Sequence, residues 1–375
     1  WDRWCTNPLF AGGFIWVYCD EAPKRSDKGG ILDSDKSNAP DGVVGPRREK
    51  EGSYYAIRAQ WSPIQLKPLL ITNHFDGRFL LTNEYTFTNL KDCRMTYKVL
   101  SCGTPLQGNA EAGKVIAEGK VQLPSINPGE TGTARFELPD SFREGDVLEL
   151  EAFDKEGKSI CNWTYPIHLA KQYFERNLAQ TTLTPAPQKA EARQTSDAIE
   201  LKSSKVSITF DAATGMIRHI KSGETEVPFK DGPVAIGMKM RYEPSLSYTR
   251  HSSDGAIYCA KYKGAADSIV WRLTNEGLLY MDAILLNRGS GGGGFDDAFM
   301  DAQVFNLGLS FSYPEQNCSG MKWMGRGPYR VWKNRIPGTN YGIWHKDYNN
   351  TITGESFENL IYPEFKGYHA NLYWA

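Results

Sequence analysis

The first sixty residues contain a short apolar run, a polar loop and a helical pattern, and this order constrains the fold most. The run Phe14-Ile15-Trp16 follows two glycines and is typical of a strand buried on both faces. Apolar residues then recur at i, i+3 and i+7 from Tyr54 to Trp61, with Ser53 as the N-cap and Pro63 as the stop of a helix. These elements form one β/α unit. A single unit cannot bury both faces of its strand, so the pattern predicts further strands beside it.

Such a unit is typical of the last strand of a (β/α)8 barrel, whose strands face the substrate at their C-terminal ends. Trp16 lies at that end and offers a flat apolar surface with one N–H donor, which suits stacking on a sugar. A tryptophan of the barrel core is an equally open alternative. We expect residues 1–64 to be the C-terminal end of a catalytic barrel whose main body lies upstream, since the chain starts at Trp1 rather than at Met.

From residue 65 the pattern changes to short β-rich runs separated by Asn, Asp and Gly. These runs are residues 69–72, 77–83, 86–89, 95–100, 133–138 and 147–153. Regular short strands with turn signals predict an immunoglobulin-like sandwich, which we assign to residues 65–170. The polar, proline-containing residues 171–194 are interpreted as a linker.

A second β region is predicted for residues 195–375. The sequence Asp211-Ala212-Ala213-Thr214-Gly215 between alternating runs is a hairpin signal. Further strands are expected at 199–201, 206–210, 257–263, 268–273, 278–286 and 307–313. We interpret this region as a large β-sandwich that is incomplete at Ala375. The fold class is therefore mainly β, and the glycine tract at 289–294 is expected to be a mobile loop.

Composition excludes several classes of function. The formal net charge is −1, so nothing favours a nucleic-acid partner or an acidic membrane surface. No apolar run of about 18 residues predicts a transmembrane span. The seven cysteines form no CxxC pair, which argues against a zinc site; most are expected to be buried thiols, and a Cys93–Cys102 disulfide stays open. No cofactor is evident. Asp296, Asp297 and Asp301 could bind a cation, although a solvated loop is the favoured interpretation.

Four segments occur in a characteristic order: Gly12–Trp16, Asp41–Glu51, Asp211–Gly215 and Trp323–Tyr329. Together they resemble the C-terminal half of glycoside hydrolase family 2, of the large bacterial β-galactosidase type. The Trp-x-Gly-x-Gly-Pro stretch at 323–328, with Asn334-Arg335 downstream, is the most specific element. Residues 361–364 and Gly367 are similar to a tyrosine–proline segment of the same sandwich. The resemblance implies a catalytic barrel, an immunoglobulin-like domain and a large β-sandwich, in that order.

The resemblance also implies a retaining mechanism with two glutamates, one acid/base and one nucleophile. In the family both lie on earlier barrel strands, so they are expected upstream of Trp1, and no catalytic residue is assigned here. Glu21, Glu49 and Glu51 are the only glutamates near the expected barrel mouth, and surface or ion-pair roles are favoured for them. This chain alone is accordingly expected to be inactive.

The candidate substrate-binding residues are Trp16, Asp41, Arg47 and Arg48. The resemblance implies that Trp16 lines the sugar pocket and that Asp41 stands where β-galactosidases carry an asparagine near the sugar. The arginines depart from that pattern. Because arginine binds carboxylates bidentately, they support the hypothesis of an acidic sugar such as a uronide, with a solvated loop as the alternative. Downstream, sandwich turn and core roles are expected for Arg326, Tyr329, Arg330 and Trp332.

Three functions remain open at this level. The favoured one is the C-terminal part of an exo-glycosidase that hydrolyses O-glycosidic bonds of β-galactosides. A β-glucuronidase-like activity on acidic sugars and a non-catalytic carbohydrate-binding or scaffold fragment are the alternatives. The β/α unit favours the enzyme, since a free binding module has no use for it. The resemblance further implies a carbohydrate partner and leaves open a homo-oligomer and a need for Mg²⁺ or Na⁺. A periplasmic or extracellular location is favoured over a cytoplasmic one.

Overall fold

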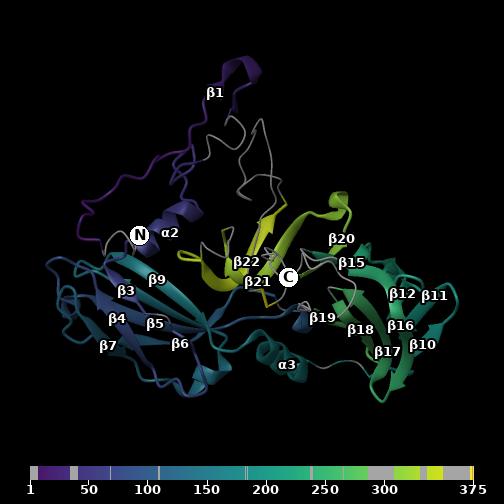
Figure 1. The fold of residues 1–375 in the computed structure, drawn as a ribbon. Helices are drawn as coiled ribbons and strands as arrows, with labels where there is room; N and C mark the ends of the chain where they lie inside the picture. The colour runs from purple at the N-terminus through teal and green to yellow at the C-terminus, as the bar shows by residue number, and fades with distance from the viewer. Residues whose placement is uncertain are drawn as a thin grey trace. The chain divides into compact units, whose positions relative to one another are not determined.

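The computed structural model forms two compact units, Trp1–Thr181 with Ser319–Ala375, and Thr182–Cys318 (Figure 1). The structure describes residues 7–33, 41–67, 69–108, 110–181, 183, 185–236, 240–264, 266–285, 308–329, 336–348, 372–373 and 375. Both units consist mainly of antiparallel sheets, and the predicted mainly-β fold is confirmed. The bounds predicted for the individual domains stay predictions.

In the N-terminal segment the structure differs from the sequence-based expectation at one point. Residues Phe14–Trp16 form no strand, and the side chains of Phe14 and Trp16 are exposed. A strand of this type needs neighbours on both edges for its backbone hydrogen bonds, and the described residues supply none. Instead, the short strands β1 (Lys24–Arg25) and β2 (Ile31–Leu32) pair as an antiparallel hairpin.

The predicted helix is confirmed as α2 (Gly52–Gln60). Its N-cap is Glu51 rather than Ser53, and it ends before Pro63. The guanidinium of Arg58 donates to the backbone oxygen of Ile160 at 2.9 Å and to the hydroxyl of Ser159 at 2.8 Å. These bonds fix α2 against the neighbouring sandwich.

That sandwich consists of seven strands in two sheets. The first sheet has the order β3 (Ile64–Leu66), β4 (Arg78–Asn83) and β7 (Thr131–Arg135). The second has the order β6 (Lys114–Val121), β5 (Arg94–Ser101), β8 (Val147–Phe153) and β9 (Ser159–Pro166). An antiparallel sheet of three strands packed against one of four is the arrangement of an immunoglobulin-like sandwich. The predicted runs 69–72 and 86–89 are not strands, and β3, β6 and β9 lie outside the predicted runs.

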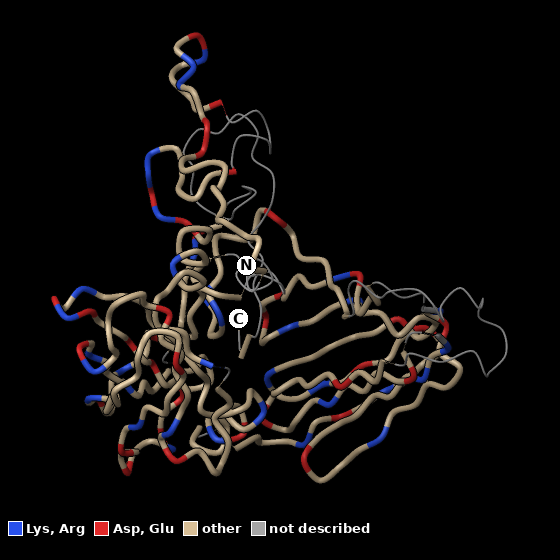
Figure 2. The backbone as a smooth tube through the Cα atoms, turned by 60° about the vertical axis from the view of Figure 1, so that its left-hand side comes forward, with Lys and Arg blue, Asp and Glu red and all other residues tan. Residues whose placement is uncertain are grey.

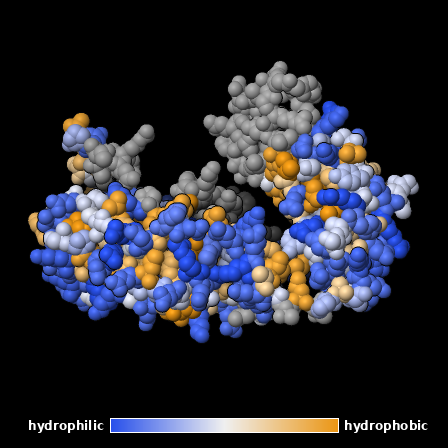
Figure 3. All heavy atoms as spheres, turned by 90° about the horizontal axis from the view of Figure 1, so that it is seen from below, coloured by the Kyte–Doolittle hydropathy of each residue, from blue (hydrophilic) through white to orange (hydrophobic). Residues whose placement is uncertain are grey.

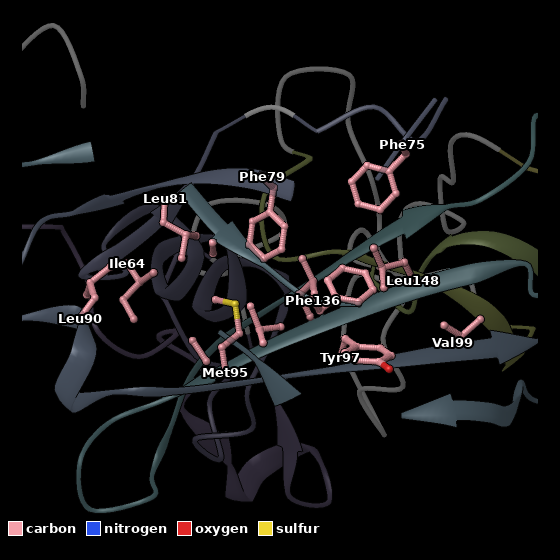
Figure 4. Packing of buried hydrophobic residues seen from close by; sticks show 14 of the residues in the cluster. Ile64, Phe75, Phe79, Leu81, Leu90, Met95, Tyr97, Val99, Phe136 and Leu148 are labelled. Carbon is pink, nitrogen blue, oxygen red and sulfur yellow. The ribbon is translucent and has the colours of Figure 1, made fainter. Parts of the chain in front are cut away.

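Aliphatic and aromatic side chains fill the space between these two sheets (Figure 4). The ring of Phe136 stacks on that of Tyr97, with centroids 4.4 Å apart, and meets the rings of Phe79 and Phe75 at 6.4 and 6.1 Å. Residues of β8 alternate between the core and the opposite face, as the period of a strand requires. The two sheets therefore enclose a hydrophobic core that belongs to this sandwich alone.

The same unit contains α3 (Ala170–Gln180) and a hairpin of β21 (Gly320–Gly327) and β22 (Asn340–Asp347). The hairpin packs on the sandwich, where the backbone N–H of Tyr341 donates to the hydroxyl of Thr164 at 2.6 Å. The Trp-x-Gly-x-Gly-Pro motif runs along β21. Its Trp323 is fully buried and donates to the backbone oxygen of Arg326 at 3.0 Å. Residues 171–194, expected to be a linker, include most of α3 and, further along the chain, strand β10.

The second unit has a five-stranded sheet in chain order: β10 (Glu191–Gln194), β11 (Ala198–Lys202), β12 (Val206–Asp211), β13 (Ile217–Ser222) and β14 (Thr225–Glu226). A four-stranded sheet follows: β16 (Met240–Ser252), β17 (Gly255–Gly264), β18 (Ala266–Thr274) and β19 (Leu279–Leu285). Strands β15 (Lys230–Ile236) and β20 (Gly308–Ser312) form a separate pair. Phe210 packs against Tyr258 and Trp271 between the two larger sheets.

The predicted hairpin at Asp211–Gly215 is confirmed between β12 and β13. The Asp211 carboxylate accepts from the backbone N–H of Thr214 at 2.8 Å, and Gly215 has a φ of 73°. The glycine tract at 289–294, the three aspartates at 296, 297 and 301, and the motif residues Asn334 and Arg335 lie outside the described residues, as do residues 361–364 and Gly367.

The described surface shows no concentration of one charge sign. Figure 2 shows Lys and Arg interspersed with Asp and Glu along both units, in line with the net charge of −1. On the face seen in Figure 3, hydrophilic residues predominate and hydrophobic ones occur in small groups. Among the described residues, no helix combines the length and the apolar character that a membrane span requires.

Candidate functional site

The candidate site is built from two stretches far apart in sequence, Val17–Asp20 and Gly42–Gly45. The backbone N–H of Val43 donates to the oxygen of Val17, and that of Val44 to the oxygen of Tyr18, each at 3.0 Å. In return the N–H of Asp20 donates to the oxygen of Val44 at 2.9 Å. The thiol of Cys19 also donates to the oxygen of Gly45 at 3.1 Å. These bonds bring the end of the polar loop beside the stretch that follows Trp16.

Asp20 is the buried carboxylate of this contact, with a residue exposure of only 7%. Its Oδ1 accepts from the backbone N–H of Gly42 at 2.6 Å. Burial raises the pKa of Asp20 to about 6, the Gly42 bond acts against that rise, and the charges of Asp41 and Glu49 add to it. Sequence reasoning missed Asp20, because one acidic residue in a polar stretch carries no signal and its partner lies 22 positions away.

The two arginines lie on a tight turn next to this contact. The N–H of Arg48 donates to the oxygen of Gly45 at 2.8 Å, and the carboxylate of Glu49 accepts from the N–H of Arg47 at 2.7 Å. The Glu49 side chain folds over Gly45, where a Cβ would collide with it. Arg47 and Arg48 are both exposed, and neither has an ion pair with any residue that the structure describes. Their guanidinium groups are therefore directed to solvent.

The structure brings the predicted site residues together only in part. Asp41 directly precedes Gly42 and is thus part of the contact with Asp20. Trp16 is 81% exposed, so it is not a core residue of the described chain. No described contact joins Trp16 to Arg47 or Arg48. All four residues are exposed: Trp16 and Asp41 directly precede the two hydrogen-bonded stretches, and Arg47 and Arg48 follow the second one.

The hairpin of the Trp-x-Gly-x-Gly-Pro motif reaches the helix that follows the arginine turn. The ring of Tyr329 stacks on that of Tyr55 in α2, with centroids 4.9 Å apart. Gly338 lies directly against the backbone of Tyr55, which leaves no room for a side chain at position 338. Arg326 lies in strand β21 and Tyr329 is half-buried against α2, so the turn and core roles within the large sandwich stay predictions. Arg330 and Trp332 lie outside the described residues.

A polar hollow of about 620 Å³ lies on the five-stranded sheet of the second unit. Its lining includes Lys202, Lys205 and Lys221, together with His219, whose Nδ1 lies 3.0 Å from the Glu226 carboxylate. No Phe, Tyr or Trp side chain lines this hollow, so it lacks the large flat apolar surface on which sugars stack.

Within the described ranges, no group of three or more His, Cys, Asp or Glu residues could hold a metal ion. Cys93 and Cys102, whose pairing the sequence left open, are free thiols. Burial raises the pKa of Cys102 to about 12, which keeps this thiol protonated and unreactive.

Comparison with known proteins identifies one part of the chain. Residues 79–163 match the family model described as β-galactosidase, domain 4, which covers most of the immunoglobulin-like sandwich. The resemblance predicted from the sequence is thereby confirmed for this part. No curated protein matches the chain.

Among solved structures, the exo-chitosanase CsxA of Amycolatopsis orientalis is 8% identical with a TM-score of 0.22. A complex of the same enzyme with PNP-β-D-glucosamine is 8% identical with a TM-score of 0.20. Each match covers 67% of this chain and 30% of the other chain, so the matched part spans less than a third of those proteins. With TM-scores this low, neither the fold nor the function of this chain is inferred from these structures.

Proposed function

We propose that this chain is the C-terminal part of a retaining exo-glycosidase of glycoside hydrolase family 2, because residues 79–163 match the family model of β-galactosidase domain 4. The longer enzyme hydrolyses O-glycosidic bonds, and β-galactosides are the substrates proposed first. The domain match is the observation that carries this proposal. A carbohydrate is the corresponding partner.

The exposed apolar residues before the sandwich support a longer protein. Phe14 is fully exposed and Trp16 nearly so, although both are large apolar side chains in one short run. Contiguous apolar surface of this kind is normally covered by another part of a protein. Neighbouring strands of a barrel would cover this run and present Trp16 to a bound sugar, as the sequence pattern predicts. The two catalytic glutamates are then placed upstream of Trp1.

One observation favours a second candidate, an acidic sugar as substrate. Arg47 and Arg48 are exposed on a rigid turn and make no ion pair with the described residues. Unpaired guanidinium groups near a sugar site bind carboxylates in the bidentate geometry that a uronide offers. The β-glucuronidase-like alternative therefore rests on this turn.

Turnover of a panel of nitrophenyl glycosides by the longer protein tests both candidates. We expect turnover of the β-galactoside, and none by the 375-residue chain alone. If the substrate is acidic, the glucuronide is turned over instead, and Arg47→Ala with Arg48→Ala lowers its kcat/KM about 100-fold while sparing neutral glycosides. Equal losses on neutral and acidic sugars would contradict the role of the arginines. A longer protein that turns over no glycoside would overturn the proposed function.

A further inference from the structure

The contact between Asp20 and Gly42 is the closest approach of the two stretches. A Cβ at Gly42 would collide with the backbone N of Asp20 and lie 2.7 Å from its Oδ1. No residue other than glycine fits at position 42 without moving the segment. Asp20 therefore occupies the space that a side chain at position 42 would need.

We propose that Asp20 is a positioning residue, whose buried carboxylate holds the Gly42 amide and thereby fixes the arginine turn relative to the stretch Val17–Asp20. The turn begins at Gly45, only three residues after Gly42, and its own hydrogen bonds make it rigid. Fixing Gly42 thus sets where Arg47 and Arg48 project. That Arg47 and Arg48 meet a substrate there rests on the proposed function. The contact between Asp20 and Gly42 is independent of that function.

The charges around Asp20 determine how this contact depends on pH. Asp41 and Glu49 belong to the segment packed against Asp20, and both repel its negative charge. The pKa of Asp20 is about 6 in the closed arrangement, above its ordinary value of 3.8. The closed form therefore binds a proton more tightly than an open form does, and closing is favoured as the pH falls from about 7 to about 4.

Hydrogen exchange of the 375-residue chain, followed by mass spectrometry on peptides within residues 41–50, tests the proposal without any sugar. Asp20→Ala removes the acceptor, so at pH 7.5 the amides of residues 42–45 are expected to lose about 10-fold in protection. Asp20→Asn keeps an acceptor and removes the buried charge. Its protection is expected to equal or exceed that of the wild type and to be independent of pH.

The matched control is Asp27→Ala, which removes an exposed carboxylate paired with Arg25 in the same segment and leaves residues 42–45 unchanged. Gly42→Ala separates the stretches without altering the carboxylate and is expected to reproduce the exchange of Asp20→Ala. Unchanged protection in residues 147–153 shows that the sandwich is folded in each variant.

Two results would overturn the proposal. One is unchanged exchange of residues 42–45 in Asp20→Ala, whatever Gly42→Ala does. The other is an Asp20→Asn variant that loosens as much as Asp20→Ala does, because Asn has the same size and keeps an acceptor, so its failure would show that the hydrogen bond to Gly42 does not hold the turn. If exchange follows the proposal while the longer protein turns over no glycoside, the positioning role stands and the proposed function falls.

Discussion

At the scale of single residues, the tightest turns depend on glycines with a positive φ. Gly215 closes the hairpin between β12 and β13 with a φ of 73°. A Cβ there would collide with the Tyr262 hydroxyl and lie 3.0 Å from that of Tyr258. Both tyrosines are buried and have little freedom to move. The turn therefore combines backbone strain with a packing limit.

Gly215→Ala is accordingly expected to lower the free energy of unfolding of the second unit by about 2 kcal/mol. Urea unfolding followed by tryptophan fluorescence measures the loss. Gly223→Ala is the control, because Gly223 has a φ of 58° but open space around its Cα, and it should cost at most about 1 kcal/mol. Equal losses in the two variants would show that the tyrosines do not limit the turn.

The sequence identified some residues of the candidate site and not others, for a physical reason. Trp16 stands out as a tryptophan at the end of a strand-like run. Arg47 and Arg48 stand out as neighbouring arginines in a charged loop. Asp20 does not, because its role comes from burial against Gly42, and burial depends on a contact across 22 positions. Local patterns carry no information about such contacts.

At the scale of elements, a group of aromatic rings packs together within the core of the immunoglobulin-like sandwich. Phe136 is buried and contacts the rings of Phe75, Phe79, Tyr97 and Phe142. Its side chain joins the two sheets at their centre (Figure 4). Loss of this ring would leave a cavity that the surrounding strands can close only in part.

Phe136→Ala is expected to lower the free energy of unfolding of the sandwich by about 4 kcal/mol. Thermal or urea unfolding gives the value. Phe87→Ala serves as the control, because Phe87 is 94% exposed, and its change should stay within about 0.5 kcal/mol. A small loss for Phe136→Ala would mean that the core does not depend on this ring.

Strands with clear alternation were predictable, as β4, β5 and β8 show. The runs 69–72 and 86–89 also contain apolar residues, but Leu70 and Phe87 are exposed and neither run has a strand partner. Strand β9 contains a buried Cys161 and Thr164 within a mixed sequence, so its alternation is hidden. Pairing, which joins distant segments, decides such cases and is not visible in a single run.

At the scale of the whole molecule, the C-terminal hairpin belongs to the same compact unit as the sandwich near the N-terminus. Chain order gave no indication of this, because residues 182–318 separate the two parts in sequence. The contact uses Thr164, Tyr341 and the stacked pair of Tyr55 and Tyr329. Residues 79–163, which match the family model of β-galactosidase domain 4, lie within this unit.

In the function that we propose, this chain completes a retaining glycosidase whose nucleophile lies upstream. A retaining enzyme forms a covalent glycosyl intermediate on a carboxylate. A 2-deoxy-2-fluoro glycoside of the preferred sugar traps this intermediate, and peptide mass spectrometry of the longer protein locates it. We predict one adduct per protein molecule, on a glutamate outside the 375 residues described by this sequence. An adduct on Glu21, Glu49, Glu51 or any other residue of this chain would contradict the claim, as would the absence of an adduct during turnover.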